Sequence, residues 1–448
     1  MKISAHSLAA LAFFAVLPVA FAQVPFALSD SLTNGTFVRS VTVADVNGDG
    51  RPDLISVRGN PSFLYVWTNI GSGIFVSNAS YAVGGFPYQV IAADVNNDGW
   101  PDLITANNGG NSLTVLTNDT HGNFALSATL PEGSGQAPQS VAAADLYGRG
   151  HLDLISANSL NASFTIWTNS GGGVFGSNIS FSVGSPGYVV PKWVTVADVN
   201  GDGKPDIIGG CNNSDTYYLH IWTNNGVGGF APDPVPFLNL NGILCVAVAD
   251  VNGDGKPDLA LVASTLSANG VLVLTNNGSG GFSRTGYYPV GSNPFAVVAA
   301  DVNGDGAVDL ISANAGDNTL TILTNNGSGI FSSNATLSVG SGPESLTTAD
   351  INGDGRMDLI SGNWNGGTLT VSTNASTFLP QLLLRRSGAN VVVSWPAVWL
   401  NWMLQENTSL NGGSWTSFSG PIGNDGVTRR ATNSVTGASG FFRLSSAP

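Results

Sequence analysis

A nine-residue acidic loop recurs along the chain, with a pattern close to Asp-x-Asn-Gly-Asp-Gly-x-x-Asp. The first copy is DVNGDGRPD from Asp45, and the others begin at Asp94, Asp145, Asp198, Asp250, Asp301 and Asp350. An intact copy offers side-chain oxygens at positions 1, 3, 5 and 9 and a backbone carbonyl at position 7. Glycine at position 6 permits the sharp turn that gathers these oxygens around one point. Oxygen donors in this number suit a hard cation with about six to eight ligands, so we predict calcium rather than zinc or copper.

Six of the seven loops keep every donor. The predicted ligands, with the position-7 residue giving only its carbonyl, are Asp45, Asn47, Asp49, Arg51 and Asp53; Asp94, Asn96, Asp98, Trp100 and Asp102; Asp198, Asn200, Asp202, Lys204 and Asp206; Asp250, Asn252, Asp254, Lys256 and Asp258; Asp301, Asn303, Asp305, Ala307 and Asp309; and Asp350, Asn352, Asp354, Arg356 and Asp358.

The third loop differs, because Tyr147 and Arg149 replace the donors at positions 3 and 5. We predict no metal there, with Arg149 as a fixed positive charge in its place. A single loop of this composition could be an ordinary turn, since Asp, Asn and Gly all favour turns. Six copies that keep all four side chains argue against that interpretation. An EF-hand is also excluded, because position 12 holds no Glu and a strand-like run, 54–57, follows the first loop.

The net charge of −14 also reflects these loops, which hold most of the 29 acidic residues. If six loops each bind a divalent cation, the charge becomes about −2. The acidity therefore indicates calcium chemistry, and a nucleic-acid partner is not expected.

The N-terminus predicts export. Lys2 precedes an apolar stretch, 8–21, and small residues end in a cleavage point after Ala22, as in a secretory signal peptide of residues 1–22. No later segment is apolar enough for a membrane-spanning helix. The two cysteines, Cys211 and Cys245, match no metal or redox motif and leave a disulfide and two buried thiols as equal alternatives.

Each repeat also predicts four short strands. One enters the loop, a second leaves it, a third ends in Thr-Asn, as at Trp67-Thr-Asn69, and a fourth follows a glycine turn and a Phe. Seven such periods predict a seven-bladed β-propeller, an all-β fold. The seventh period lacks its fourth strand, and residues 25–32 resemble it, so we expect the N-terminal strand to close the ring.

The acidic loops and the Asn-Gly-Ser-Gly-x-Phe turns resemble FG-GAP/VCBS repeats, which form the propeller of integrin α-subunits and of many exported bacterial proteins. The resemblance covers about residues 24–378, which we take as the propeller domain, 23–378. It implies that the calcium loops lie on the lower face and that ligands engage the opposite, upper face. Residues 379–448 break the period, and their alternating runs predict a small β-sandwich-like domain.

The turns predicted on the upper face are rich in amides and aromatic residues. Four asparagines share one register, thirteen residues after the first aspartate, and a tryptophan follows the last: Asn107, Asn158, Asn314, Asn363 and Trp364. Amides and aromatic rings suit sugar hydroxyls or a peptide surface, so these are the candidate ligand-binding residues. The alternative is that Asn simply tolerates left-handed turn geometry. Trp67, Trp167 and Trp222 alternate with Leu at one position and are assigned to packing between blades.

Catalytic motifs are scarce. The sequence has no Gly-x-Ser-x-Gly elbow and no zinc-ligand run such as His-x-x-x-His. A carbohydrate-binding or adhesive module is the leading prediction, with polysaccharide or a cell-surface protein as partner. A protein-interaction scaffold is the first alternative. A polysaccharide lyase or hydrolase is the second, and its base would be Lys192, Arg58, Tyr188 or Tyr217.

Overall fold

The computed structural model describes residues 23–33, 35, 37–183, 189–213, 219–234, 243–264, 269–376, 383–387, 390–396, 402–407, 416–420, 422–424, 428–434 and 441–446. All regular secondary structure in these ranges is β-strand. The predicted signal segment lies outside the described residues, as do Tyr188 and Tyr217. Within the described residues, no helix is long and apolar enough to cross a membrane.

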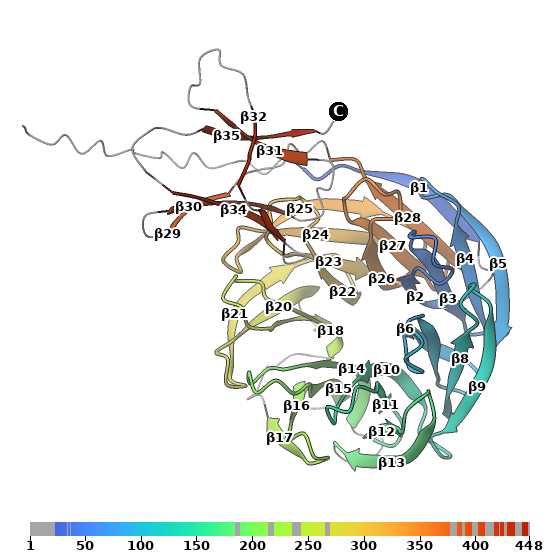
Figure 1. The fold of residues 1–448 in the computed structure, drawn as a ribbon. Helices are drawn as coiled ribbons and strands as arrows, with labels where there is room; N and C mark the ends of the chain where they lie inside the picture. The colour runs from blue at the N-terminus through green and yellow to red at the C-terminus, as the bar shows by residue number, and fades with distance from the viewer. Residues whose placement is uncertain are drawn as a thin grey trace, which may run out of the picture.

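The repeats form seven four-stranded antiparallel sheets arranged as blades around a ring (Figure 1). Blade 1 contains β2 (Val38–Ala44), β3 (Asp53–Arg58), β4 (Phe63–Asn69) and β5 (Phe75–Ala82); blade 2 contains β6 (Pro87–Ala93), β7 (Asp102–Asn107), β8 (Ser112–Asn118) and β9 (Phe124–Pro131); blade 3 contains β10 (Pro138–Ala144), β11 (Asp153–Asn158), β12 (Ser163–Asn169) and β13 (Phe175–Ser182); blade 4 contains β14 (Val189–Ala197), β15 (Asp206–Asn213), β16 (Leu219–Asn224) and β17 (Phe230–Pro234).

The remaining blades follow the same order. Blade 5 contains β18 (Ile243–Ala249), β19 (Asp258–Ser264), β20 (Asn269–Asn276) and β21 (Phe282–Pro289); blade 6 contains β22 (Pro294–Ala300), β23 (Asp309–Asn314), β24 (Thr319–Asn325) and β25 (Phe331–Ser338); blade 7 contains β26 (Pro343–Ala349), β27 (Asp358–Asn363), β28 (Thr368–Asn374) and β1 (Phe26–Thr33).

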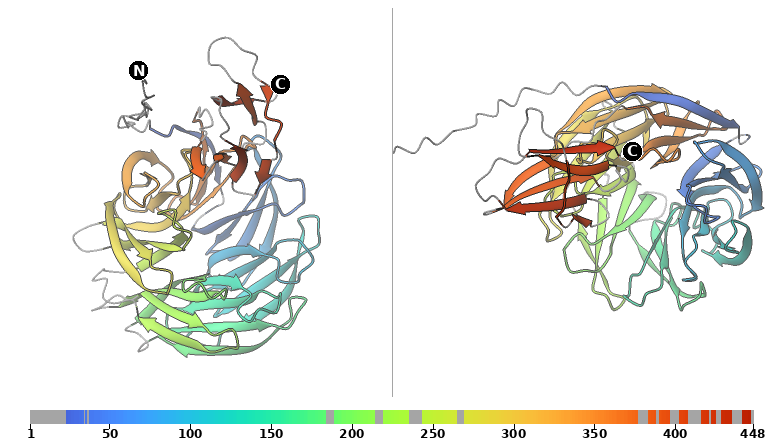
Figure 2. Two further views of the ribbon diagram at one scale, coloured as in Figure 1. Left: turned by 60° about the vertical axis from the view of Figure 1, so that its left-hand side comes forward. Right: turned by 45° about the horizontal axis from the view of Figure 1, so that its top comes forward.

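Blade 7 is completed by the N-terminal strand. β1 pairs antiparallel with β28, from Phe26 opposite Asn374 to Thr33 opposite Thr368. The two ends of the repeat array therefore share one sheet (Figure 1, Figure 2). This closure leaves no blade with a missing strand and removes an exposed edge from the ring.

The core lies between neighbouring blades. One apolar cluster joins Val95 and Ile104 of blade 2 to Leu154 and Trp167 of blade 3, and the other blade pairs have equivalent clusters. Trp167 and Trp222 are buried, and Trp67 packs against the cluster between blades 7 and 1. The assignment of these tryptophans to inter-blade packing is therefore confirmed.

Two small antiparallel sheets follow the propeller. One has the order β29 (Leu383–Ser387), β30 (Asn390–Pro396), β34 (Thr428–Ser434), β33 (Ile422–Asn424). The other has the order β32 (Thr416–Ser417), β31 (Trp402–Asn407), β35 (Phe441–Ser446). The C-terminal segment thus has its own sheets, with Val393, Leu404 and Ala431 buried.

Candidate functional site

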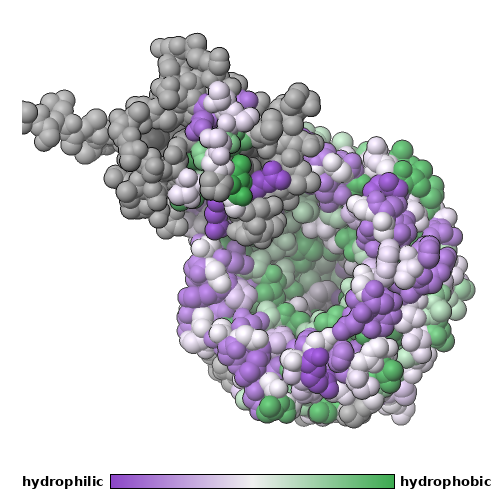
Figure 3. Space-filling model, viewed as in Figure 1, coloured by the Kyte–Doolittle hydropathy of each residue, from purple (hydrophilic) through white to green (hydrophobic). Residues whose placement is uncertain are grey.

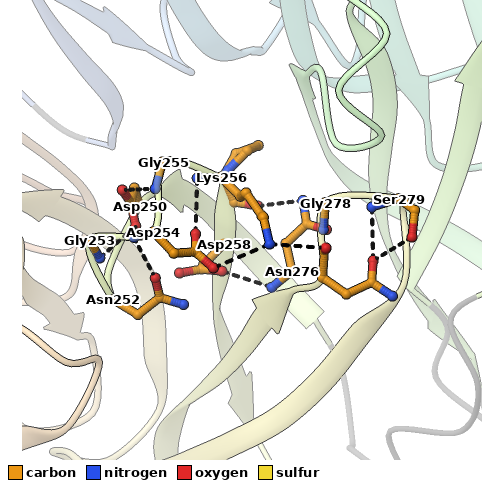
Figure 4. Close-up of polar contacts among 12 residues, drawn as sticks. Asp250, Asn252, Gly253, Asp254, Gly255, Lys256, Asp258, Asn276, Gly278 and Ser279 are labelled. Carbon is orange, nitrogen blue, oxygen red and sulfur yellow. Dashed lines mark hydrogen bonds and ion pairs between the residues drawn. The ribbon is translucent and has the colours of Figure 1, made fainter.

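Each acidic loop joins the first strand of a blade to the second and is folded around its own side chains. In blade 5, Asp250 Oδ1 accepts the Gly253 and Asp254 amides at 2.8 and 3.1 Å, and its Oδ2 accepts the Gly255 amide at 2.7 Å (Figure 4). Asn252 Oδ1 accepts the Asp254 amide at 2.8 Å. These contacts hold the oxygens of positions 1, 3 and 5 on the inside of a tight turn.

The aspartate at position 9 is the buried end of the loop. Asp258 is fully buried, and its two oxygens accept the backbone amides of Val251 and Asn276 at 3.1 and 2.8 Å. The same pair of bonds recurs in every blade. Since a carboxylate has about four acceptor sites, both oxygens retain capacity for a further donor or a cation.

The asparagine of each Thr-Asn pair ties its blade to the preceding blade. Asn276 Nδ2 donates to the Val199 carbonyl in the loop of blade 4, at 2.8 Å. Asn69 makes the equivalent bond to Ile351 at 2.7 Å, across the seam between blades 1 and 7. The Thr-Asn motif is visible in the sequence, but its role was missed, because the acceptor lies in a different repeat.

Negative charge is concentrated in the intact loops. Burial raises the pKa of Asp309 to about 8, and the neighbouring Asp301 and Asp305 carboxylates add to the shift. Burial likewise raises the pKa of Asp53 and of Asp358 to about 6. A cation bound among these groups would remove the cost of burying the carboxylates in their charged form.

The third loop supplies such a cation from the chain itself. Arg149 Nη2 lies 2.7 Å from Asp153 Oδ1, the buried position-9 carboxylate, and the guanidinium lies 4.5 Å from the centre of the Tyr147 ring. The prediction that Arg149 provides a fixed positive charge is confirmed. In four intact loops the basic residue at position 7 contacts position 5 instead, as Lys256 does with Asp254 at 3.6 Å.

The intact loops fit a calcium ion by donor type. Each has three carboxylates, an Asn amide oxygen and the position-7 carbonyl, which are the hard oxygen ligands that calcium prefers. Among the described residues, no group of three His, Cys, Asp or Glu side chains is arranged so that it could hold a metal ion. The reason is local. The position-1 and position-5 carboxylates bond to loop amides, and in four of the loops position 5 also pairs with the basic side chain at position 7. Trp100, at position 7 of the second loop, is half-buried over Gly48.

The four register asparagines are not on the binding surface, and this candidate assignment was wrong. Asn107, Asn158, Asn314 and Asn363 are fully buried. Asn314 Nδ2 donates to Thr319 and Thr321 at 3.1 and 2.9 Å, and its Oδ1 accepts from Ser312 at 3.0 Å. The amides therefore cross-link the second and third strands inside blades 2, 3, 6 and 7.

The upper face instead opens into a central channel. A cavity of about 640 Å³ is lined by the innermost strands of all seven blades. Figure 3 shows the corresponding hollow at the centre of the ring, with hydrophobic residues along its wall. Because the acidic loops join the first and second strands below, the starts of the innermost strands lie at the upper mouth of this channel.

Every innermost strand has a β-bulge at the same position. The pairing register of β2 with β3 shifts between Val38 and Ser40, which leaves Arg39 unpaired, and the other six blades repeat the shift. A bulge re-aims the extra side chain. All seven bulge residues are half-buried and line the cavity; in order around the ring they are Arg39, Tyr88, Gln139, Lys192, Leu244, Phe295 and Glu344.

The bulge residues differ from blade to blade, although their surroundings repeat. Two residues further along the strand, the equivalent position is Val in six blades and Leu346 in the seventh. Packing between similar blades thus constrains the residue type at that position, whereas the residue type at the bulge differs from blade to blade. We call these seven residues the bulge ring.

Arg39 is held by its neighbours in the ring and above it. Its guanidinium pairs with Glu344 and lies 4.2 Å from the centre of the Tyr88 ring and 3.4 Å from that of Trp364. Trp364 also contacts Phe37, with ring centres 4.7 Å apart. Trp364, one of the candidate ligand-binding residues, is therefore half-buried in a cluster that positions Arg39 and is not a freely exposed aromatic side chain.

Backbone strain accompanies the bulges. The residues just before four innermost strands are non-glycine residues with left-handed φ: Phe37 (67°), Phe86 (53°), Ala137 (51°) and Asn293 (52°). Such a conformation costs about 1–2 kcal/mol for a residue with a Cβ. Strained backbone gathers at ligand sites when the surrounding structure enforces it. The channel mouth is therefore the candidate ligand site.

Comparison with protein families agrees with this architecture. The model described as "FG-GAP-like repeat" matches residues 45–105, 94–156, 145–209, 198–261, 260–312 and 301–361, which together span more than half of the 448 residues. The chain belongs to the FG-GAP-like repeat family. No curated protein matches the sequence.

Solved structures show the same fold at low identity. "BBS1N in complex with ARL6DN, soaked with lead" is 12% identical, with a TM-score of 0.57 over 80% of this chain and 99% of that chain. A lectin of Agrocybe aegerita, described with specific recognition of non-reducing terminal N-acetylglucosamine, is 23% identical, with a TM-score of 0.47 over 74% of this chain and 86% of that chain. The first match supports the FG-GAP-like propeller fold alone, and the second is too distant to add to it.

The cysteines of this FG-GAP-like propeller are both thiols. Cys211 and Cys245, in blades 4 and 5, are buried and form no disulfide. Burial raises the pKa of the Cys245 thiol to about 12, so neither the geometry nor the ionisation suits a reactive cysteine.

Proposed function

We propose that this protein is an exported, calcium-stabilised propeller that binds carbohydrate at the upper mouth of its central channel. The bulge ring is the observation that carries the proposal. It places two aromatic rings, Tyr88 and Phe295, and the Gln139 amide around one cavity of about 640 Å³. Aromatic faces pack on the C–H surface of a sugar, and amides bond its hydroxyls. A cavity of this volume accommodates a short saccharide rather than a folded domain.

Retention on polysaccharide tests this function. The purified protein, in millimolar calcium, would be incubated with a panel of neutral and acidic polysaccharides, and we expect retention that a free oligosaccharide of the same type reverses. Absence of retention on every member would contradict the proposal. A protein-interaction scaffold with a cell-surface partner would then replace it.

Calcium has a structural role in the proposal. The oxygen donors of six loops, the raised pKa values of buried carboxylates such as Asp309, and the Arg149 substitute in the third loop all support it. At calcium concentrations tenfold above the dissociation constant, each site adds about 1.4 kcal/mol to the free energy of unfolding. We expect the melting temperature to fall when a chelator removes calcium. An unchanged melt would reject the metal assignment.

Export is supported by the N-terminal sequence, and the N-terminal residue of the mature protein tests it. Cleavage after Ala22 predicts a chain that begins at Gln23. A mature chain that still begins at Met1 would contradict this part of the proposal.

Lys192 favours a polysaccharide lyase as a second candidate. Among the bases considered from the sequence, Lys192 lies in the cavity, and burial followed by the charge of Arg39 lowers its pKa. An amine with a lowered pKa is a better general base near neutral pH. Unsaturated products released from an acidic polysaccharide would establish this activity, and their absence at high enzyme concentration would reject it.

A further inference from the structure

The charges in the bulge ring are unequally compensated. Arg39 and Glu344 belong to adjacent blades and form an ion pair, with 12% and 14% of their side chains exposed. Lys192, three blades away from Arg39, has no hydrogen-bond or ion-pair partner among the described residues. Within the part of the chain that the structure describes, the positive charge of Lys192 at the channel mouth is therefore uncompensated, in a chain whose formal charge is −14.

An unpaired ammonium in this position is costly. Lys192 is half-buried, and desolvation together with the nearby Arg39 guanidinium disfavours its charged form, as the lowered pKa shows. A bound anion would offset both effects by supplying an opposite charge and a charge-assisted hydrogen bond. Arg39 is less available for this role, since Glu344 and two aromatic rings already surround its guanidinium.

The neighbours of Lys192 indicate what carries the anion. Leu244 and Phe295, the next two ring members, give the cavity an apolar wall, and Gln139 lies on the other side of Lys192. A suitable ligand has an apolar face, hydroxyl groups and one negative charge within a few ångströms of one another. A sugar acid combines these groups in a single ring.

We infer that the channel mouth selects saccharides bearing a carboxylate, with the Lys192 ammonium as the partner of that carboxylate. This inference rests on the proposed carbohydrate-binding function and makes it more specific. Lysine acts here as a point charge, while Leu244 and Phe295 provide the surface for the sugar ring.

The experiment measures binding of short oligosaccharides to the full protein by calorimetry in millimolar calcium. The probes are oligomers of galacturonate, glucuronate and mannuronate, the methyl ester of each, a neutral oligomer of similar length and a sulfated one. We expect at least one uronate to bind about tenfold or more tightly than its own methyl ester, because esterification removes the charge and keeps the sugar ring. Binding should weaken with salt.

Substitutions of Lys192 test whether its ammonium is the group that binds the carboxylate. Lys192→Gln should weaken uronate binding about tenfold or more and leave binding of the methyl ester unchanged, whereas Lys192→Arg should restore part of the uronate affinity. The matched control is Arg284→Gln, which removes an exposed positive charge from β21, the outermost strand of blade 5. This control should bind uronate as the unmodified protein does.

The outcomes separate this inference from the function on which it rests. Equal affinity for a uronate and its ester, or an unaltered uronate affinity in Lys192→Gln, would overturn the carboxylate assignment while carbohydrate binding stands. Binding of the sulfated oligomer alone would overturn it in favour of another anion. Failure of every saccharide, neutral or charged, would contradict the proposed function itself.

Discussion

Arg149 donates to the buried carboxylate of Asp153 across 2.7 Å, in the loop that keeps Asp145 at position 1 but has lost the aspartate at position 5. The six intact loops keep the equivalent carboxylate without a cation this close to it. One repeat has thus replaced a predicted metal ion with a side chain, which gives an internal comparison for testing the calcium proposal.

Metal stoichiometry should distinguish the two kinds of loop. Asp254→Ala removes a carboxylate from the fifth loop, and we expect the bound calcium per chain, measured by elemental analysis after desalting, to fall by one site. Arg149→Met should leave the stoichiometry unchanged, yet lower the free energy of unfolding by about 1–3 kcal/mol, because a buried carboxylate loses its partner. Loss of calcium from Arg149→Met would show that the third loop also binds metal.

The register asparagines should matter for stability and not for binding. Asn314→Ala removes three side-chain hydrogen bonds inside blade 6 and leaves hydroxyl groups unpaired. We expect the free energy of unfolding, from denaturant titration, to fall by about 1–3 kcal/mol. Saccharide affinity should be unchanged, and a selective loss of affinity without a loss of stability would return Asn314 to the binding site.

The seam between blades 7 and 1 should be more sensitive to loss of its inter-blade hydrogen bond than the other seams are. Asn69→Ala and Asn276→Ala delete the same inter-blade bond. Blades 4 and 5 are joined by continuous chain, whereas β1, which leads into blade 1, is held in blade 7 only by its non-covalent pairing with β28. Each variant should lose about 1 kcal/mol or more. Limited proteolysis should additionally release the region of β1 faster in Asn69→Ala, and equal cleavage rates in both variants would contradict this account of closure.

His220 should make stability depend on pH. It lies beside Trp222, with ring centres 5.1 Å apart, and burial lowers its pKa from 6.5 to about 4. The unfolded chain then binds more protons between about pH 6.5 and about pH 4, so stability contributed by the neutral histidine is lost as pH falls through this window. The loss is at most about 3 kcal/mol.

The comparison with His220→Gln isolates this contribution. In saturating calcium, the difference in unfolding free energy between the two proteins should change across the window and be constant above about pH 7. A difference that is independent of pH would show that the His220 pKa is not lowered.

The periodic features of the fold were predictable from the sequence. The loop spacing and alternating strands indicated the propeller, and the incomplete last repeat indicated closure by residues 25–32, where the structure has β1. Arg149 was identified because it replaces a donor at a defined position of a repeated loop. Each of these inferences depends on local pattern or on comparison between copies.

Contacts between strands were harder to predict. Asn314 ends a strand, and its sequence context is that of a turn residue, whereas its burial depends on hydroxyl groups of Thr319 and Thr321 in the next strand. The bulge ring was found only in part: Lys192 was named as a candidate base, while Arg39 and Glu344 were missed. A bulge has no period-2 signature, but the aligned repeats do show a variable position two residues before a nearly constant Val.

The location of the ligand is the central claim, and one paired measurement tests it most directly. Phe295→Ala removes an aromatic ring from the channel mouth, and Leu126→Ala removes an exposed apolar side chain, 63% exposed, from the outer strand β9. Affinity for the retained saccharide would be measured for both, with melting temperatures as the control for folding. The account predicts about a tenfold or greater loss for Phe295→Ala and none for Leu126→Ala. Unchanged affinity in a folded Phe295→Ala protein would contradict the claim that the saccharide binds at the channel mouth.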